Sequence, residues 1–103
     1  MKFINLTPHT INLNSGDSFE PSGIIARVSA SYSKFDGNLV CRQEFGAVEN
    51  LPAPKEDTVY IVSALVISAV TDRDDIVAPA TGHPDCQRNK QGHIVSVPGF
   101  VRK

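Results

Sequence analysis

The residues best suited to bind a ligand are polar side chains placed at turns and strand ends. One early turn brings an amide, a hydroxyl and an imidazole together, from Asn5, Thr7 and His9. Arg27 lies within an apolar alternation, so its guanidinium is committed to a sheet surface or to a pocket. Ser63 precedes a helical pattern, where its hydroxyl and the free backbone N–H groups beyond it form a cradle for an anion. A fork-shaped cation beside several neutral donors suits a molecule that carries phosphate or ribose.

A charged run, Asp72-Arg73-Asp74-Asp75, adds Arg73 and Asp75 to this candidate ligand-binding set. The run also has the pattern of a solvated loop that ends a helix, because one-residue spacing sends neighbouring carboxylates in different directions. The other candidates have structural alternatives too. In the structural interpretation, the role of Thr7 is to cap a turn, that of Arg27 is to pair with an acid on the neighbouring strand, and that of Ser63 is to cap its helix. Both interpretations stay open at the level of sequence.

Metal and catalytic chemistry have little support. His83 and Cys86 have the spacing of zinc ligands, and completing the site would take His93 with His9 or Cys41, but structural zinc sites usually repeat this spacing in both halves. Neither cysteine lies in a nucleophile signature, and the phosphate-loop, dinucleotide and nucleophile-elbow motifs are absent from the sequence. We therefore predict no catalytic residue, no metal and no cofactor.

Charge and composition narrow the classes further. The chain has 103 residues, 41% of them hydrophobic, and a net charge of −1, which argues against general nucleic-acid binding. The net charge of residues 1–82 is −4, and the net charge of residues 83–103 is +3. The basic end meets phosphates or an acidic partner, or is simply solvated. No apolar signal segment follows Met1, and the apolar run over residues 59–70 is too short for a membrane span. We expect a cytoplasmic protein with reduced cysteines.

Alternating and turn-forming residues predict a single domain over residues 1–103 with five to seven short strands. The strands are expected at residues 3–6, 10–14, 24–31, 39–43, 58–62, 76–78 and 93–97. Ser63 is expected to cap one short helix over residues 64–70, and residues 79–91 to form a polar loop. The predicted fold class is mostly β or α+β, a compact antiparallel sheet or barrel-like domain.

The order of sequence blocks resembles a family of small proteins encoded by bacteriophages and prophages. The blocks are Asn5–His9, Pro21–Val28, Leu51–Pro54, Tyr60–Val66 and Arg73–Pro79, followed by Gly92–Phe100. They span nearly the whole chain. The tract between Pro79 and Gly92 is longer here than the family pattern, which puts any role of His83, Pro84 and Cys86 in doubt.

A phage setting implies an accessory protein that acts in the cytoplasm of the bacterial host cell. We expect it to bind and sequester a nucleotide-derived immune signal, of cyclic nucleotide or ADP-ribose type, as an anti-defence sponge and a homo-oligomer. The alternative is a protein–protein module that inhibits a host defence protein or forms a minor virion component. A small hydrolase or lyase that uses His9 as acid or base is the third hypothesis.

Overall fold

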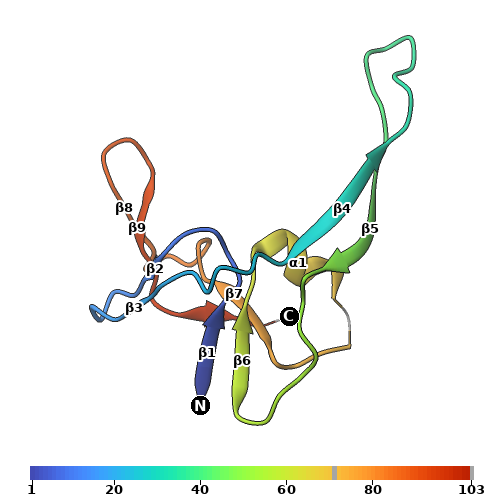
Figure 1. The fold of residues 1–103 in the computed structure, drawn as a ribbon. Coiled ribbons are helices and arrows are strands. Elements are labelled where there is room, and N and C mark those ends of the chain that lie inside the picture. The colour runs from blue at the N-terminus through green and yellow to red at the C-terminus, as the bar shows by residue number, and fades with distance from the viewer. Residues whose placement is uncertain (71, 103) are drawn as a thin grey trace.

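The computed structural model describes residues 1–70 and 72–102 (Figure 1). The described residues form ten strands and one helix, which confirms the mostly β or α+β class. In chain order the elements are β1 (Lys2–Asn5), β2 (Ile11–Asn12), β3 (Ser18–Phe19), β4 (Arg27–Tyr32), β5 (Gln43–Glu49), β6 (Thr58–Ile61), α1 (Ala64–Ala69), β7 (Ile76–Pro79), β8 (Gln87–Arg88), β9 (Ile94–Ser96) and β10 (Phe100–Val101).

The central sheet has four strands in the order β1-β6-β7-β10. β1, β6 and β7 run parallel, and β10 joins β7 antiparallel. The expectation of an antiparallel sheet or barrel is wrong for this part of the chain. The sheet is open, and α1 forms the crossover from β6 to β7 that a parallel pair requires. Side-chain alternation does not encode strand direction, so the sequence pattern could not have shown this.

Three antiparallel pairs complete the described structure: β2 with β3, β4 with β5, and β8 with β9. The observed bounds of these pairs differ from the expected ones. The strand expected from residue 24 begins only at Arg27, and the strand expected over residues 10–14 covers only Ile11–Asn12. Residues 39–43 were expected to be a strand, but Leu39 adopts a positive φ of 65° in a turn. The Asp36 carboxylate accepts the backbone N–H groups of Asn38 and Val40 there, so the ladder starts only at Gln43. Strand β8 lies in the expected polar loop, because two-residue strands leave almost no periodic signal.

The central sheet is buried on both faces. On one face, Tyr60 and Val62 join a core cluster with Leu6, Val66 of α1 and Ile76. On the other face, Val59, Ile61 and Val77 pack with Ile11 and Val97, and three rings from Phe3, Phe19 and Phe100 extend this second cluster. A nearly continuous apolar strand such as β6 is typical of a sheet covered on both sides.

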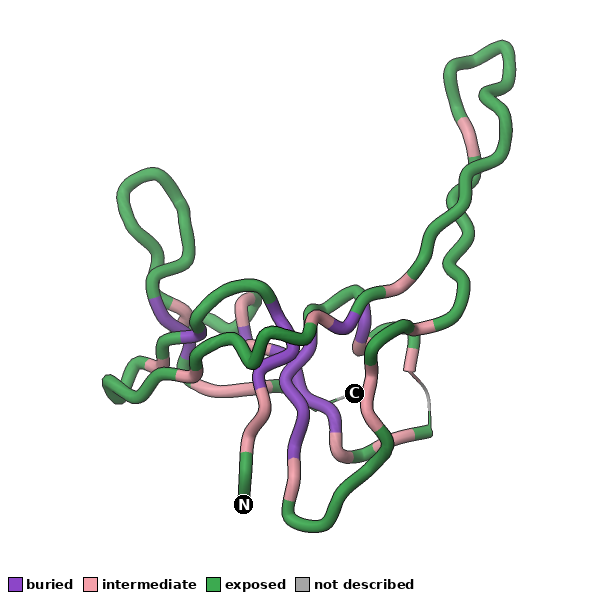
Figure 2. The backbone as a smooth tube through the Cα atoms, viewed as in Figure 1, coloured by how far each residue is buried: buried purple, intermediate pink, exposed green. Residues whose placement is uncertain are grey.

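Strands β4 and β5 form a hairpin arm, residues 27–49, that projects from the body of the molecule (Figure 1). Almost the whole arm is exposed, and only a few positions are partly buried (Figure 2). Val28 and Val48, at its base, pack against the first core cluster. The prediction of a compact domain therefore holds for the body and is wrong for the arm.

Candidate functional site

A concave pocket lies where the three parallel strands end. Its lining includes Pro8 and His9 after β1, Ser63 after β6 and Thr81 after β7, all at the carboxyl edge of the sheet. The pocket has a volume of about 430 Å³. In open sheets with parallel strands, ligands bind in the crevice outside the carboxyl ends of the strands. We call this cavity the carboxyl-edge pocket.

The carboxyl-edge pocket brings together three of the predicted site residues, Thr7, His9 and Ser63. Its walls are mainly apolar, and they include Ile11 of β2 and Ile94 of β9, which lie far apart in the sequence. Among the described residues that line it, His9 is the one titratable side chain. An apolar cavity with a few convergent polar groups is the usual form of a small-molecule site, and its volume falls within the usual range.

Asn5 supports this pocket from behind. Its side chain is 2% exposed, and its amide nitrogen donates to the carbonyl oxygens of His9 at 2.8 Å and Phe19 at 3.0 Å. Its amide oxygen accepts from the Thr7 backbone N–H at 2.9 Å and from the Thr7 hydroxyl at 2.6 Å. These four bonds use the full capacity of an asparagine side chain. Asn5 therefore fixes the turn that carries His9 and has no bonding capacity left for a ligand.

Ser63 caps α1, as the structural interpretation of the sequence predicts. Its hydroxyl oxygen accepts the Val66 backbone N–H at 3.3 Å. The helix has only six residues, fewer than two turns, so its dipole adds little to anion binding. The Ser63 side chain is exposed at the pocket.

Arg27 lies elsewhere. It is the exposed first residue of β4 and stands opposite Glu49 of β5 in the arm ladder. It is not part of the carboxyl-edge pocket lining. The structure thus places Arg27 on an exposed sheet ladder, with Glu49 as its register partner on the neighbouring strand.

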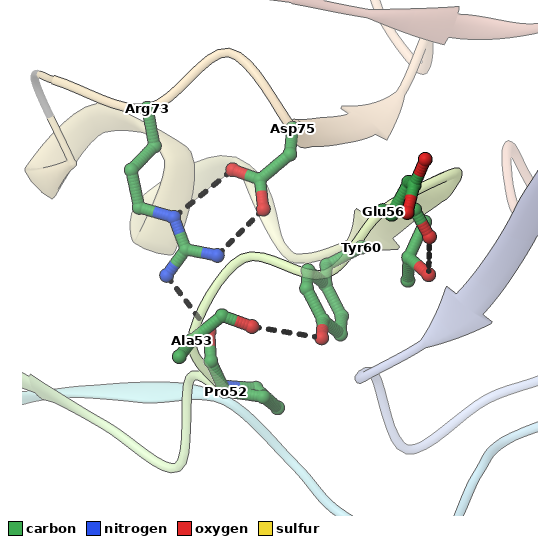
Figure 3. A network of polar contacts seen from close by, with 7 residues as sticks. Pro52, Ala53, Glu56, Tyr60, Arg73 and Asp75 are labelled. Carbon is green, nitrogen blue, oxygen red and sulfur yellow. Dashed lines mark hydrogen bonds and ion pairs between the residues drawn. The ribbon is translucent and has the colours of Figure 1, made fainter.

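Arg73 and Asp75 pair with each other instead of facing the pocket (Figure 3). Two guanidinium nitrogens donate to the two carboxylate oxygens, at 2.9 and 2.6 Å, and a third donates to the Pro52 carbonyl at 2.8 Å. The guanidinium carbon lies 5.8 Å from the centre of the Tyr60 ring, whose hydroxyl donates to the Ala53 carbonyl. This network ties the connector before β6 to the start of β7.

The pairing of Arg73 with Asp75 shifts the pKa of both side chains. The hydrogen bonds from Arg73 lower the pKa of the Asp75 carboxyl, and the same bonds raise the pKa of the Arg73 guanidinium. The carboxylate is held in its charged form and its lone pairs are directed at Arg73. Asp75 and Arg73 are therefore structural partners in this arrangement.

Sequence reasoning did not single out several residues that line the pocket. They are Thr81, Asn12 and Ser96, with the apolar wall of Val95 and Val97. The available signal was position, because Thr81 comes shortly after an expected strand and Ser96 alternates with Val95 and Val97. Reading that signal required the parallel order of the strands, which the sequence pattern does not give.

His83 and Cys86, the pair with the spacing of zinc ligands, make contacts within the protein. The Nδ1 atom of His83 accepts the Asp85 backbone N–H at 3.0 Å, and Cys86 packs at the edge of the second core cluster. Across residues 1–70 and 72–102, no group of three or more His, Cys, Asp or Glu side chains is placed to hold a metal ion.

Comparison of the chain with protein-family models, with curated proteins and with solved structures finds no match. The resemblance to a phage family therefore stays a prediction. Within the described part of the chain, α1 is the one helix, and no helix has the length and apolar character that crossing a membrane requires.

Proposed function

We propose that the protein binds a small molecule in the carboxyl-edge pocket. The observation that carries this proposal is the convergence of three post-strand segments on one cavity of about 430 Å³, which brings Thr7, His9 and Ser63 to its wall. Asn5 holds the first of these segments with three hydrogen bonds and ties it to Phe19 of β3 with a fourth, so this wall of the site is held in place before any ligand arrives.

The lining favours the nucleoside part of a nucleotide-derived ligand. Apolar walls from Ile11, Ile94 and Val95 suit the faces of a base, and the hydroxyl groups of Ser63 and Thr81 suit ribose. Arg27 and Arg73 do not belong to the lining, so this proposal directs phosphate groups toward the mouth of the pocket and solvent. Sequestration of a host immune signal of cyclic nucleotide or ADP-ribose type is the role that this binding would serve.

A thermal-shift screen tests binding directly. The purified protein is heated with nucleosides, nucleotides, cyclic dinucleotides and ADP-ribose variants. A ligand at a hundredfold excess over its Kd adds about 2.7 kcal/mol, and so roughly 10 °C in a domain of this size. His9→Ala should reduce the shift, whereas His93→Ala, an exposed histidine outside the pocket lining, should leave it unchanged. An absence of any shift across the panel would contradict the proposal.

A second measurement separates sequestration from turnover. The bound molecule is released by denaturing the protein after a long incubation and is then identified by mass spectrometry. A sponge returns the ligand intact, whereas a hydrolase or lyase returns a product. Recovery of a product that depends on His9 would replace the sponge hypothesis with the enzyme hypothesis.

A further inference from the structure

The arm has one apolar face and one polar face. The ladder places Ala30 opposite Phe45 and Tyr32 opposite Gln43, on the same side as the pair formed by Val28 and Val48. The other face carries charged and hydroxyl side chains, from Arg27, Ser31, Glu44 and Glu49. An antiparallel ribbon with this alternation is the pattern of a sheet that has one face covered and one face in water.

The apolar face begins inside the core and then continues without cover. Val28 and Val48 pack against the first core cluster. Further out, Phe45 is 48% exposed and Tyr32 is 64% exposed. The tip adds Phe35, Leu39 and Val40, all exposed. Two-stranded hairpins are at best marginally stable in water, so an apolar face of this length calls for a partner.

The area of the chain shows how large that partner surface is. A compact monomer of 11.1 kDa exposes about 5,700 Å², whereas this chain exposes 7170 Å². Its radius of gyration is 15.7 Å, against about 13 Å for a compact domain of this length. The chain therefore exposes roughly 1,500 Å² more than a compact monomer would, and the arm is the longest segment that projects from the body (Figure 1).

A stable interface buries about 800 Å² on each partner. Burying about half of the excess surface of each chain would therefore be enough for a stable dimer. The charges of the arm also allow a copy of itself as partner. Within residues 27–49, three cations and three acids balance, from Arg27, Lys34 and Arg42 with Asp36, Glu44 and Glu49. A neutral arm neither repels an identical arm nor steers toward an oppositely charged protein.

We propose that two copies of this chain pack the apolar faces of their arms against each other. The contact is isologous, because the same patch, Ala30, Tyr32 and Phe45, serves on both sides of a twofold axis. The polar faces then point to solvent on both outer surfaces. This dimer goes beyond small-molecule binding and does not depend on it, since the arm residues are not part of the carboxyl-edge pocket lining.

Sedimentation equilibrium over a wide concentration range tests the proposal on the full chain. The expected mass is twice 11.1 kDa, or a whole multiple of that dimer mass. Phe45→Glu should halve the mass, because it places a carboxylate in the apolar contact. Ser31→Lys, on the opposite face and across from Glu44, should leave the mass unchanged. A monomeric wild type, or a dimer that Phe45→Glu leaves intact, would overturn the proposal and return the arm to the hypothesis of a host-protein partner.

Hydrogen exchange on the wild-type chain removes any dependence on whether the variants fold. On dilution, amides in β4 and β5 should exchange faster, because the arms separate, while amides in β6 should keep their protection. Exchange in the arm that is rapid and independent of concentration would count against the dimer. Ligand binding is measured separately by thermal shift on the same samples, so the failure of one proposal is distinguishable from the failure of the other.

Discussion

Strand β4 is longer than β6, with six residues against four, yet far less of it is buried. In β6 and just after it, Val59, Tyr60, Ile61 and Val62 are all buried, because one side of the sheet meets α1 and the other meets the second core cluster. In β4, only Val28 reaches the core. The comparison shows that neighbours in space decide burial, while the strand pattern states only which face needs a neighbour.

The largest expected effect comes from the buried strand. Ile61→Ala removes a side chain that is 0% exposed at the centre of the second core cluster. We expect the free energy of unfolding to fall by about 3 to 4 kcal/mol, through lost transfer energy and a residual cavity. Urea denaturation followed by circular dichroism measures this. A loss below about 1 kcal/mol would show that the second cluster is not the core that the structure describes.

Arg73→Ala should have the next largest effect. It leaves the Asp75 carboxylate and the Pro52 carbonyl without the donors that Arg73 supplies. The side chains of Arg73 and Asp75 are only 17% and 15% exposed, so water replaces these donors poorly. We expect a loss of about 2 to 3 kcal/mol, less than for a fully buried pair because water still reaches these groups. Arg42→Ala in the exposed arm is the matched control and should change stability by less than about 0.5 kcal/mol. An equal loss of stability in Arg73→Ala and Arg42→Ala would show that the body and the arm do not differ in the way that the structure describes.

The same ion pair gives the protein a pH dependence. The pKa of Asp75 is lowered in the folded protein, so its contribution to stability is complete above its unfolded pKa of about 4. The contribution is lost as the pH falls through the lowered, folded pKa. Unfolding midpoints measured between neutral pH and strong acid should therefore fall less steeply in Asp75→Asn than in the wild type. An identical acid profile in both proteins would show that the pair does not govern this dependence.

The smallest effect is expected on the polar face of the arm. Ser31→Ala changes an exposed residue opposite Glu44, and the free energy of unfolding should move by less than about 0.5 kcal/mol. A thermal melt is sufficient to detect a larger change. A loss above 1 kcal/mol would mean that this face, and not the apolar one, is covered in solution.

The sequence carried enough information for the fold class, the helix and most strands, because alternation and turn residues act locally. The Ser63 cap and the turn at Asn5 follow from the same local chemistry. Strand direction and order depend on contacts between distant segments, such as Lys2 with Thr58, and no local pattern reports them. Very short strands such as β3, β8 and β10 lie below the length at which periodicity is detectable.

The candidate site was predicted only in part for a related reason. Thr7, His9 and Ser63 meet because each follows a parallel strand, and their polar character at strand ends was visible in sequence. Arg73 and Asp75 have the same chemical character, yet they satisfy each other two residues apart. Residue type indicates which groups are able to bind a ligand, but partner geometry decides which of them are available.

The pairing of β1 with β6 has a consequence for how the chain folds. Strand β1 lies at the start of the chain, and its parallel partner begins only at Thr58, with the whole arm between them. During synthesis, Phe3, Ile4 and Leu6 stay uncovered until β6 has been made, while the arm hairpin closes early from local contacts. The late, long-range step should limit the folding rate, and a chain interrupted before residue 61 would expose an apolar strand prone to aggregation.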